Sequence, residues 1–103
     1  MRTREQYIEG LRKMKRNLYF NGSKIDRDDE EQLPSLNVMG FTFDAPHIPE
    51  LRDLCTAKSH LTGETINRFC HIHQNPQDLH HKQDMTRTLC RTGRMCIQRC
   101  MGT

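Results

Sequence analysis

Apolar residues are scarce in this sequence, and they form no long run. Hydrophobic residues make up 34% of the 103 positions, whereas an ordinary globular domain has about 45–50% apolar residues, counting glycine. No stretch approaches the roughly 20 apolar residues that a membrane-spanning helix needs. The basic N-terminus lacks the apolar segment of a signal peptide. We therefore expect one small cytoplasmic domain with no membrane association, which covers some of its apolar residues against something else.

The sequence also has no glycine-rich phosphate loop, no internal repeat and no run of like charge interleaved with aromatic residues. Its net charge of +3 is mild, with basic clusters near both ends and an acidic block at residues 26–31. No nucleic-acid-binding module is recognisable, so we expect solvated charged faces and no nucleic-acid partner. The five cysteines are odd in number, which argues against a closed disulfide framework and leaves thiols or metal ligands.

Two segments of the first half carry apolar patterns. Thr3 is a good helix cap, and apolar residues then recur at helical spacing as far as Leu18, so we predict a helix over residues 4–19, ended by Asn21-Gly22. Residues 36–43 alternate as in a strand, but Ser35 after Pro34 also resembles a helix cap. Strand and helix both stay open for this second segment.

The second half predicts a hairpin followed by helices. Residues 55–70 resemble a β-hairpin that turns at residues 61–64. Asn75 as cap, Pro76 at the first helical position and Asp78 in the first turn predict a helix over residues 76–91, with Leu79, Met85 and Leu89 on its apolar face. Thr92-Gly93 interrupts it, and a further helix is expected over residues 94–103. The fold class is therefore mainly α with a short β-hairpin.

Histidines gather around Cys70, since His71, His73, His80 and His81 follow within eleven positions. Zinc sites use cysteine and histidine, usually as pairs of ligands at short spacing around a knuckle or on a helix. A surface strand that tolerates histidines explains this cluster better, so we expect no zinc site there.

Cys96 and Cys100 form a more specific pattern. Residues four apart on a helix lie on one face, about 5–6 Å between Cβ atoms, which suits two thiolates of a polynuclear metal centre. It equally suits two small apolar residues facing a core. Iron–sulfur clusters and structural zinc both need four ligands, so this chain supplies at most half of such a site. Spacing alone favours the core interpretation and leaves the metal interpretation open.

Motifs along the whole chain resemble the 4-hydroxyphenylacetate 3-hydroxylase superfamily, and most closely its 4-hydroxybutyryl-CoA dehydratase branch. The matching segments are Glu5-Gln6-Tyr7-Ile8-Glu9, Leu11-Arg12-Lys13, Thr62-Gly63, Thr65-Ile66-Asn67-Arg68-Phe69, His73-Gln74, Asp78-Leu79, Cys96, Gln98-Arg99-Cys100 and Gly102. The paired cysteines around Gln98-Arg99 belong to the dehydratase branch and are absent from the flavin monooxygenases. This pair is therefore the discriminating motif.

The resemblance implies the N-terminal helical region of an acyl-CoA-dehydrogenase-like fold, in a homotetrameric enzyme. Such enzymes dehydrate 4-hydroxybutyryl-CoA and isomerise vinylacetyl-CoA with FAD and a [4Fe–4S] cluster. Three cysteines and one histidine hold the cluster, and the first two cysteines match Cys96 and Cys100. Gln98 and Arg87 match residues that we assign to hydrogen bonds around the site. For residues 35–44, the resemblance favours a helix.

The remaining ligands, the flavin-binding residues and the catalytic base lie beyond Thr103 in family members. We therefore expect residues 1–103 to be a partial N-terminal domain that needs the remainder of the enzyme to act on an acyl-CoA. Two alternatives remain. In the first, the chain is the same region of a flavin-dependent 4-hydroxyphenylacetate 3-monooxygenase-type enzyme. In the second, it is a small stand-alone metal-binding helical module.

Overall fold

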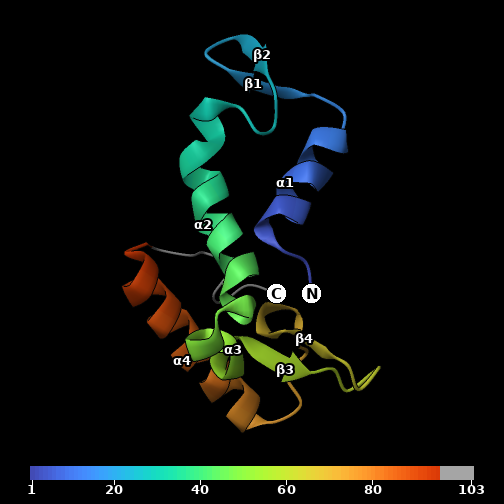
Figure 1. Ribbon diagram of the computed structural model, residues 1–103, viewed down its shortest axis with the longest axis vertical. Coiled ribbons are helices and arrows are strands. Elements are labelled where there is room, and N and C mark those ends of the chain that lie inside the picture. The colour runs from blue at the N-terminus through green and yellow to red at the C-terminus, as the bar shows by residue number, and fades with distance from the viewer. Residues whose placement is uncertain (96–103) are drawn as a thin grey trace.

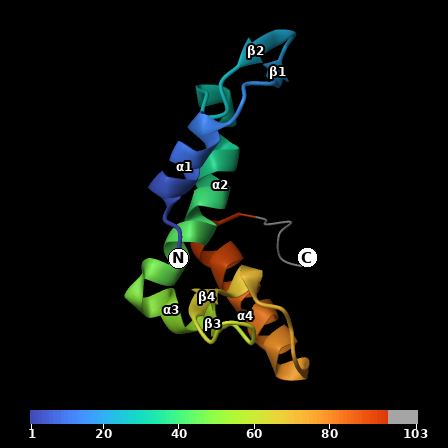
Figure 2. The ribbon, with the colours of Figure 1, turned by 90° about the vertical axis from the view of Figure 1, so that its right-hand side faces the viewer.

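A computed structural model describes residues 1–95 of the chain, which form an elongated, mainly helical molecule with principal extents of 46 × 30 × 25 Å (Figures 1 and 2). Helices α1 and α2 lie side by side in its upper half, whereas α3, α4 and the β3–β4 hairpin form its lower half. The regular elements are α1 (Arg4–Lys13), β1 (Leu18–Phe20), β2 (Ser23–Ile25), α2 (Leu33–Asp44), α3 (Pro49–Cys55), β3 (Thr56–Lys58), β4 (Thr65–Asn67) and α4 (Pro76–Gly93), with 3-10 turns at Glu30–Gln32, Ala45–His47 and Arg68–Cys70. This confirms the predicted fold class. None of the described helices is both long and apolar enough to cross a membrane.

Helix α1 begins as predicted but ends early. The Thr3 hydroxyl accepts the Gln6 N–H at 3.3 Å and the Gln6 side chain accepts the Thr3 N–H at 3.0 Å, which completes a capping box. The expected helix over residues 4–19 is wrong beyond Lys13, because Leu18–Phe20 forms strand β1 and pairs with β2. Asn21 and Gly22 both adopt positive φ angles, of 48° and 78°. Two such residues form the tight turn whose twist suits a hairpin, and this turn overrides the helical spacing of Leu18.

Helix α2 settles the segment that was ambiguous between strand and helix. Pro34 lies in its first turn, and Leu36 and Gly40, four residues apart, are both buried. Gly40 allows close approach to α1, because a Cβ atom there would lie 2.8 Å from Cγ of Arg4. The Arg4 backbone N–H donates to the Asp44 carboxylate at 3.1 Å. These contacts hold the two helices together.

Helix α4 starts at Pro76, as predicted, with the Asn75 side chain accepting the backbone N–H of Asp78. The core lies where its middle meets the α2–α3 corner and the 3-10 turn after β4. The fully or nearly fully buried residues of this core are Ala45, Cys55, Phe69, Met85 and Leu89. Met85 and Leu89 thus form the expected apolar face, whereas Leu79, expected to share it, is 45% exposed.

The β3–β4 hairpin lies within residues 55–70, where it was expected. Thr56 pairs with Asn67 and Lys58 pairs with Thr65 in antiparallel register. Gly63 has a φ angle of 73° in the connecting loop, a conformation that glycine adopts without strain. The hairpin is short, and its position depends on hydrogen bonds from Asn67 and Arg68 to the helices and to β3.

Candidate functional site

Three of the four predicted site residues, Cys96, Gln98 and Cys100, lie outside the described residues. The fourth, Arg87, is exposed on α4. It lies about 200° around the helix axis from Met85, at 100° per residue, and so faces away from the core. Helix α4 ends when Arg94 adopts a left-handed conformation, with a φ angle of 51° and its backbone N–H bonded to the Cys90 carbonyl. The further helix expected from residue 94 therefore does not begin at Arg94; its remaining residues, from 96 on, lie outside the described residues.

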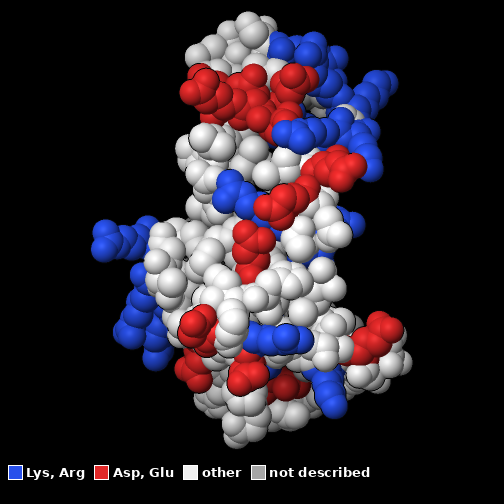
Figure 3. All heavy atoms as spheres, in the orientation of Figure 1, with Lys and Arg blue, Asp and Glu red and all other residues white. Residues whose placement is uncertain are grey.

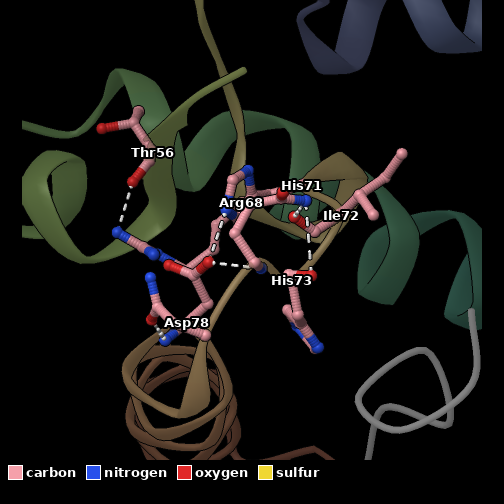
Figure 4. A network of polar contacts seen from close by, with 8 residues as sticks. Thr56, Arg68, His71, Ile72, His73 and Asp78 are labelled. Carbon is pink, nitrogen blue, oxygen red and sulfur yellow. Dashed lines mark hydrogen bonds and ion pairs between the residues drawn. The ribbon is translucent and has the colours of Figure 1, made fainter. Parts of the chain in front are cut away.

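The start of α4, the element that leads to Cys96, is fixed by a network around Asp78 (Figure 4). One carboxylate oxygen of Asp78 accepts the Gln74 backbone N–H at 2.8 Å and lies 3.1 Å from Nε2 of His71. The Gln74 N–H, and then the His71 ring, hold the pKa of Asp78 below its usual value of 3.8. Asp78 is thus ionised at neutral pH, and Nε2 of His71 donates the hydrogen bond. The other ring nitrogen of His71, Nδ1, is buried with no hydrogen-bond partner.

Two residues of the superfamily motif at residues 65–69 connect the hairpin to the helices. The Asn67 amide donates to the Thr42 carbonyl of α2 at 2.9 Å, while its oxygen accepts the Phe69 N–H at 3.0 Å. The Arg68 guanidinium donates to the carbonyls of Leu54 at 2.8 Å and Thr56 at 2.6 Å. The polar side chains of this motif therefore hold the fold together. In the sequence this motif is informative only through its resemblance to the family, and nothing in its spacing indicates the structural role.

Of the clustered histidines, His71 and His81 line one pocket together with His60 and Asp78. His71 contacts Asp78, and within residues 1–95 no group of three or more His, Cys, Asp or Glu side chains is arranged to hold a metal ion. The described cysteines Cys55, Cys70 and Cys90 are free thiols. Burial raises the pKa of Cys55 to about 11, so this thiol stays protonated at neutral pH.

Some charged residues of the N-terminal half form ion pairs with one another. Arg12 pairs with Asp28 at 2.6 Å and Arg16 pairs with Asp26 at 3.1 Å, so that α1 meets the acidic block. On the face seen in Figure 3, acidic side chains gather on the left of this end of the molecule and basic side chains mostly on the right. The two groups meet, so this end carries charge of both signs.

Comparison with known proteins gives consistent matches along the chain. A family model described as 4-hydroxyphenylacetate 3-hydroxylase N terminal matches residues 3–103. The chain is 43% identical over 102 residues to the 4-hydroxybutyryl-CoA dehydratase/vinylacetyl-CoA-Delta-isomerase of Clostridium aminobutyricum; the match covers 97% of this chain and 21% of that protein. A solved oxygen-tolerant archaeal 4-hydroxybutyryl-CoA dehydratase from N. maritimus has a TM-score of 0.85 and 33% identity, over 96% of this chain and 20% of that one. The chain therefore spans about a fifth of the length of these relatives.

Proposed function

This chain belongs to the family of the 4-hydroxyphenylacetate 3-hydroxylase N-terminal region, and we propose that it is the N-terminal part of a 4-hydroxybutyryl-CoA dehydratase/vinylacetyl-CoA isomerase. The observation that carries the proposal is 43% identity to such an enzyme along 97% of the chain. The likeness to a dehydratase structure over 96% of the chain supports the same assignment. In this proposal, an acyl-CoA is the substrate, and the complete enzyme is a cytoplasmic homotetramer.

We assign Cys96 and Cys100 as two ligands of a [4Fe–4S] cluster. Thiolate is the usual ligand of such clusters, and the described residues offer no competing group of three ligands. The other two ligands and the FAD site then belong to the rest of the enzyme. When bound, the cluster supplies a Lewis-acidic iron and the flavin supplies electron transfer. Helix α4, fixed at its start by Asp78 and packed through Met85 and Leu89, carries the chain to these cysteines.

We assign Arg87 and Gln98 to hydrogen bonds that orient the ligands and tune the metal. Arg87 is available for this role because it is exposed on α4, outside the core that Met85 and Leu89 fill. An Arg87→Lys variant keeps the charge but loses the planar fork of donors. If Arg87 orients a ligand, this variant of the assembled enzyme will bind iron normally and show a changed visible spectrum.

A second candidate is the same region of a flavin-dependent 4-hydroxyphenylacetate 3-monooxygenase. The observation that favours it is the description of the matching family model. Such an enzyme needs no iron–sulfur cluster, so the two candidates differ in what Cys96 and Cys100 do.

Anaerobic reconstitution with iron and sulfide distinguishes these candidates. The chain is tested alone and co-expressed with the downstream region of a dehydratase relative, and visible absorption and the iron-to-protein ratio are measured. We expect a brown, flavin-containing complex only with the downstream region, lost in Cys96→Ala and Cys100→Ala and retained in the control Cys70→Ala, since Cys70 is an exposed free thiol. Flavin binding without iron, unaffected by both cysteine variants, would support the monooxygenase.

A further inference from the structure

The pocket that His71 and His81 share is lined mainly by groups that carry, or can take up, positive charge. It lies between the β3–β4 hairpin and the first half of α4 and has a volume of about 370 Å³. This volume falls within the range of about 300–1,000 Å³ that is typical of small-molecule sites. We call it the basic pocket. Its charged and titratable lining residues are Lys58, His60, Arg68, His71, Asp78 and His81.

The positive charge of Arg68 is fixed in place by the fold but is not neutralised. Its Nε and Nη2 atoms donate to the backbone carbonyls of Leu54 at 2.8 Å and Thr56 at 2.6 Å, and neither carbonyl carries a net charge. None of the ion pairs among residues 1–95 includes Arg68 or Lys58. Because two hydrogen bonds already hold the guanidinium, it loses little conformational freedom when an anion binds.

The carboxylate of the basic pocket is already engaged. The Oδ2 atom of Asp78 accepts the Gln74 backbone N–H at 2.8 Å and lies 3.1 Å from Nε2 of His71, next to Arg68 in Figure 4. The other ring nitrogen of His71, Nδ1, is covered by the chain. His71 therefore acts by holding Asp78, and it offers no free donor to a ligand in the pocket.

The charges that line the basic pocket do not cancel. Lys58 and Arg68 carry two positive charges, whereas Asp78 carries one negative charge. His60 and His81 are both exposed, and each adds a positive charge when it is protonated. A metal ion does not suit this lining, because no group of three His, Cys, Asp or Glu side chains within the described part of the chain is arranged to hold one. The pocket therefore favours an anion.

We propose that the basic pocket binds a phosphate group of a small molecule, through Lys58, Arg68 and His81. A phosphate ester carries about 1.5–2 negative charges at neutral pH and several acceptor oxygens, so that it can meet a lysine, a guanidinium and an imidazole at once. For the choice of ligand, the inference rests on the proposed function. Coenzyme A has phosphate groups at its adenosine end, and an acyl-CoA substrate would therefore supply them. Free phosphate offers the same chemistry, and the test distinguishes the two sources.

The first test titrates the 103-residue chain with inorganic phosphate, adenosine 3′,5′-bisphosphate and coenzyme A, and with adenosine as the control that lacks phosphate. Binding is followed by the shifts of backbone amide signals in nuclear magnetic resonance spectra. We expect shifts around the basic pocket with each phosphate-bearing probe and none with adenosine. The Lys58→Met variant should bind each of them about fivefold more weakly, the effect of removing one exposed charge pair, and adding His81→Gln should weaken binding further. Lys24→Met, which changes an exposed lysine in strand β2, should bind like the wild type.

Equal affinity of the wild type and the Lys58→Met/His81→Gln double variant for all phosphate-bearing probes would overturn the inference. Tighter binding of coenzyme A and the bisphosphate than of inorganic phosphate would support the acyl-CoA as the source, whereas equal binding of all three would overturn that choice.

The second test uses the complex assembled with the downstream region of a dehydratase relative. In this complex, Lys58→Met should raise the KM for the acyl-CoA about fivefold, because the variant removes one exposed charge pair with a phosphate, and Lys24→Met should not. An unchanged KM in an active Lys58→Met complex would overturn the inference for the substrate. Phosphate binding that depends on Lys58 in a complex without dehydratase activity would instead overturn the proposed function and leave the phosphate site standing.

Discussion

Replacing Asn67 with alanine tests whether the motif at residues 65–69 holds the hairpin to α2. The variant loses two hydrogen bonds, the one that Asn67 donates to the Thr42 carbonyl and the one that it accepts from the Phe69 N–H. A typical intramolecular hydrogen bond contributes about 0.5–1.5 kcal/mol net. The expected loss in free energy of unfolding is therefore about 1–3 kcal/mol, with the larger values if the Thr42 carbonyl is left poorly satisfied.

Urea unfolding of the 103-residue chain, followed by far-ultraviolet circular dichroism, measures this loss. For a small protein, the free energy of unfolding falls by about 1–3 kcal/mol per M of urea. A loss of about 2 kcal/mol in this free energy therefore lowers the urea concentration at the unfolding midpoint by about 1 M. Asn17→Ala is the matched control, because Asn17 accepts a hydrogen bond from Arg27 at an exposed site. We expect the control to cost less than about 0.5 kcal/mol. Equal losses in the two variants would refute the structural role assigned to Asn67.

Two further predictions concern α4. Because the pKa of Asp78 is lowered in the folded chain, its ionised form stabilises the fold above the usual pKa of 3.8, and this contribution is lost as the pH falls through the lower folded-state value. The Asp78→Asn variant should therefore unfold at a lower urea concentration than the wild type at pH 7, and the difference should vanish near pH 2. A difference that stays constant between these pH values would contradict the assignment. The Met85→Ala variant removes a fully buried side chain and should lower the free energy of unfolding by about 2–5 kcal/mol. The control Leu79→Ala, at an exposed position of the same helix, should change the urea midpoint little. Similar losses of stability in the two variants would mean that the core is misplaced.

Local signals in the sequence predicted the starts of helices better than their ends. The cap at Asn75 with Pro76 predicted the first residue of α4, and the cap at Thr3 predicted that of α1, because such caps depend on a few neighbouring residues. The end of α1 was missed because Leu18 fits the helical spacing, although the turn at Asn21-Gly22 places it in a strand. Helical spacing identifies the residues that would share one face of a helix, but it does not show whether a helix or a hairpin forms there.

Tertiary contacts could not be predicted from the pattern of residue types. Burial of Lys82 and exposure of Leu79 both reverse the usual preference of these side chains, because the position of α4 against α2 and α3 decides which residues lie inside. The pairing of His71 with Asp78 likewise needs the chain between them to turn back on itself. For the proposed site, the spacing of Cys96 and Cys100 permitted two interpretations; both residues lie outside the described part of the chain, so their role as metal ligands stays a prediction.

The close approach at Gly40 has a consequence for how related sequences diverge. A methyl group there would lie 2.8 Å from Cγ and 2.9 Å from Cδ of Arg4, and Arg4 has little freedom to withdraw, since its backbone is bonded to Asp44 and its guanidinium to Asn37. The two positions thus share one fixed volume between α1 and α2. In relatives that keep this packing, alanine at position 40 should be accompanied by a shorter side chain at position 4. Correlated substitutions at positions 4 and 40 would then indicate, from sequences alone, that α1 contacts α2.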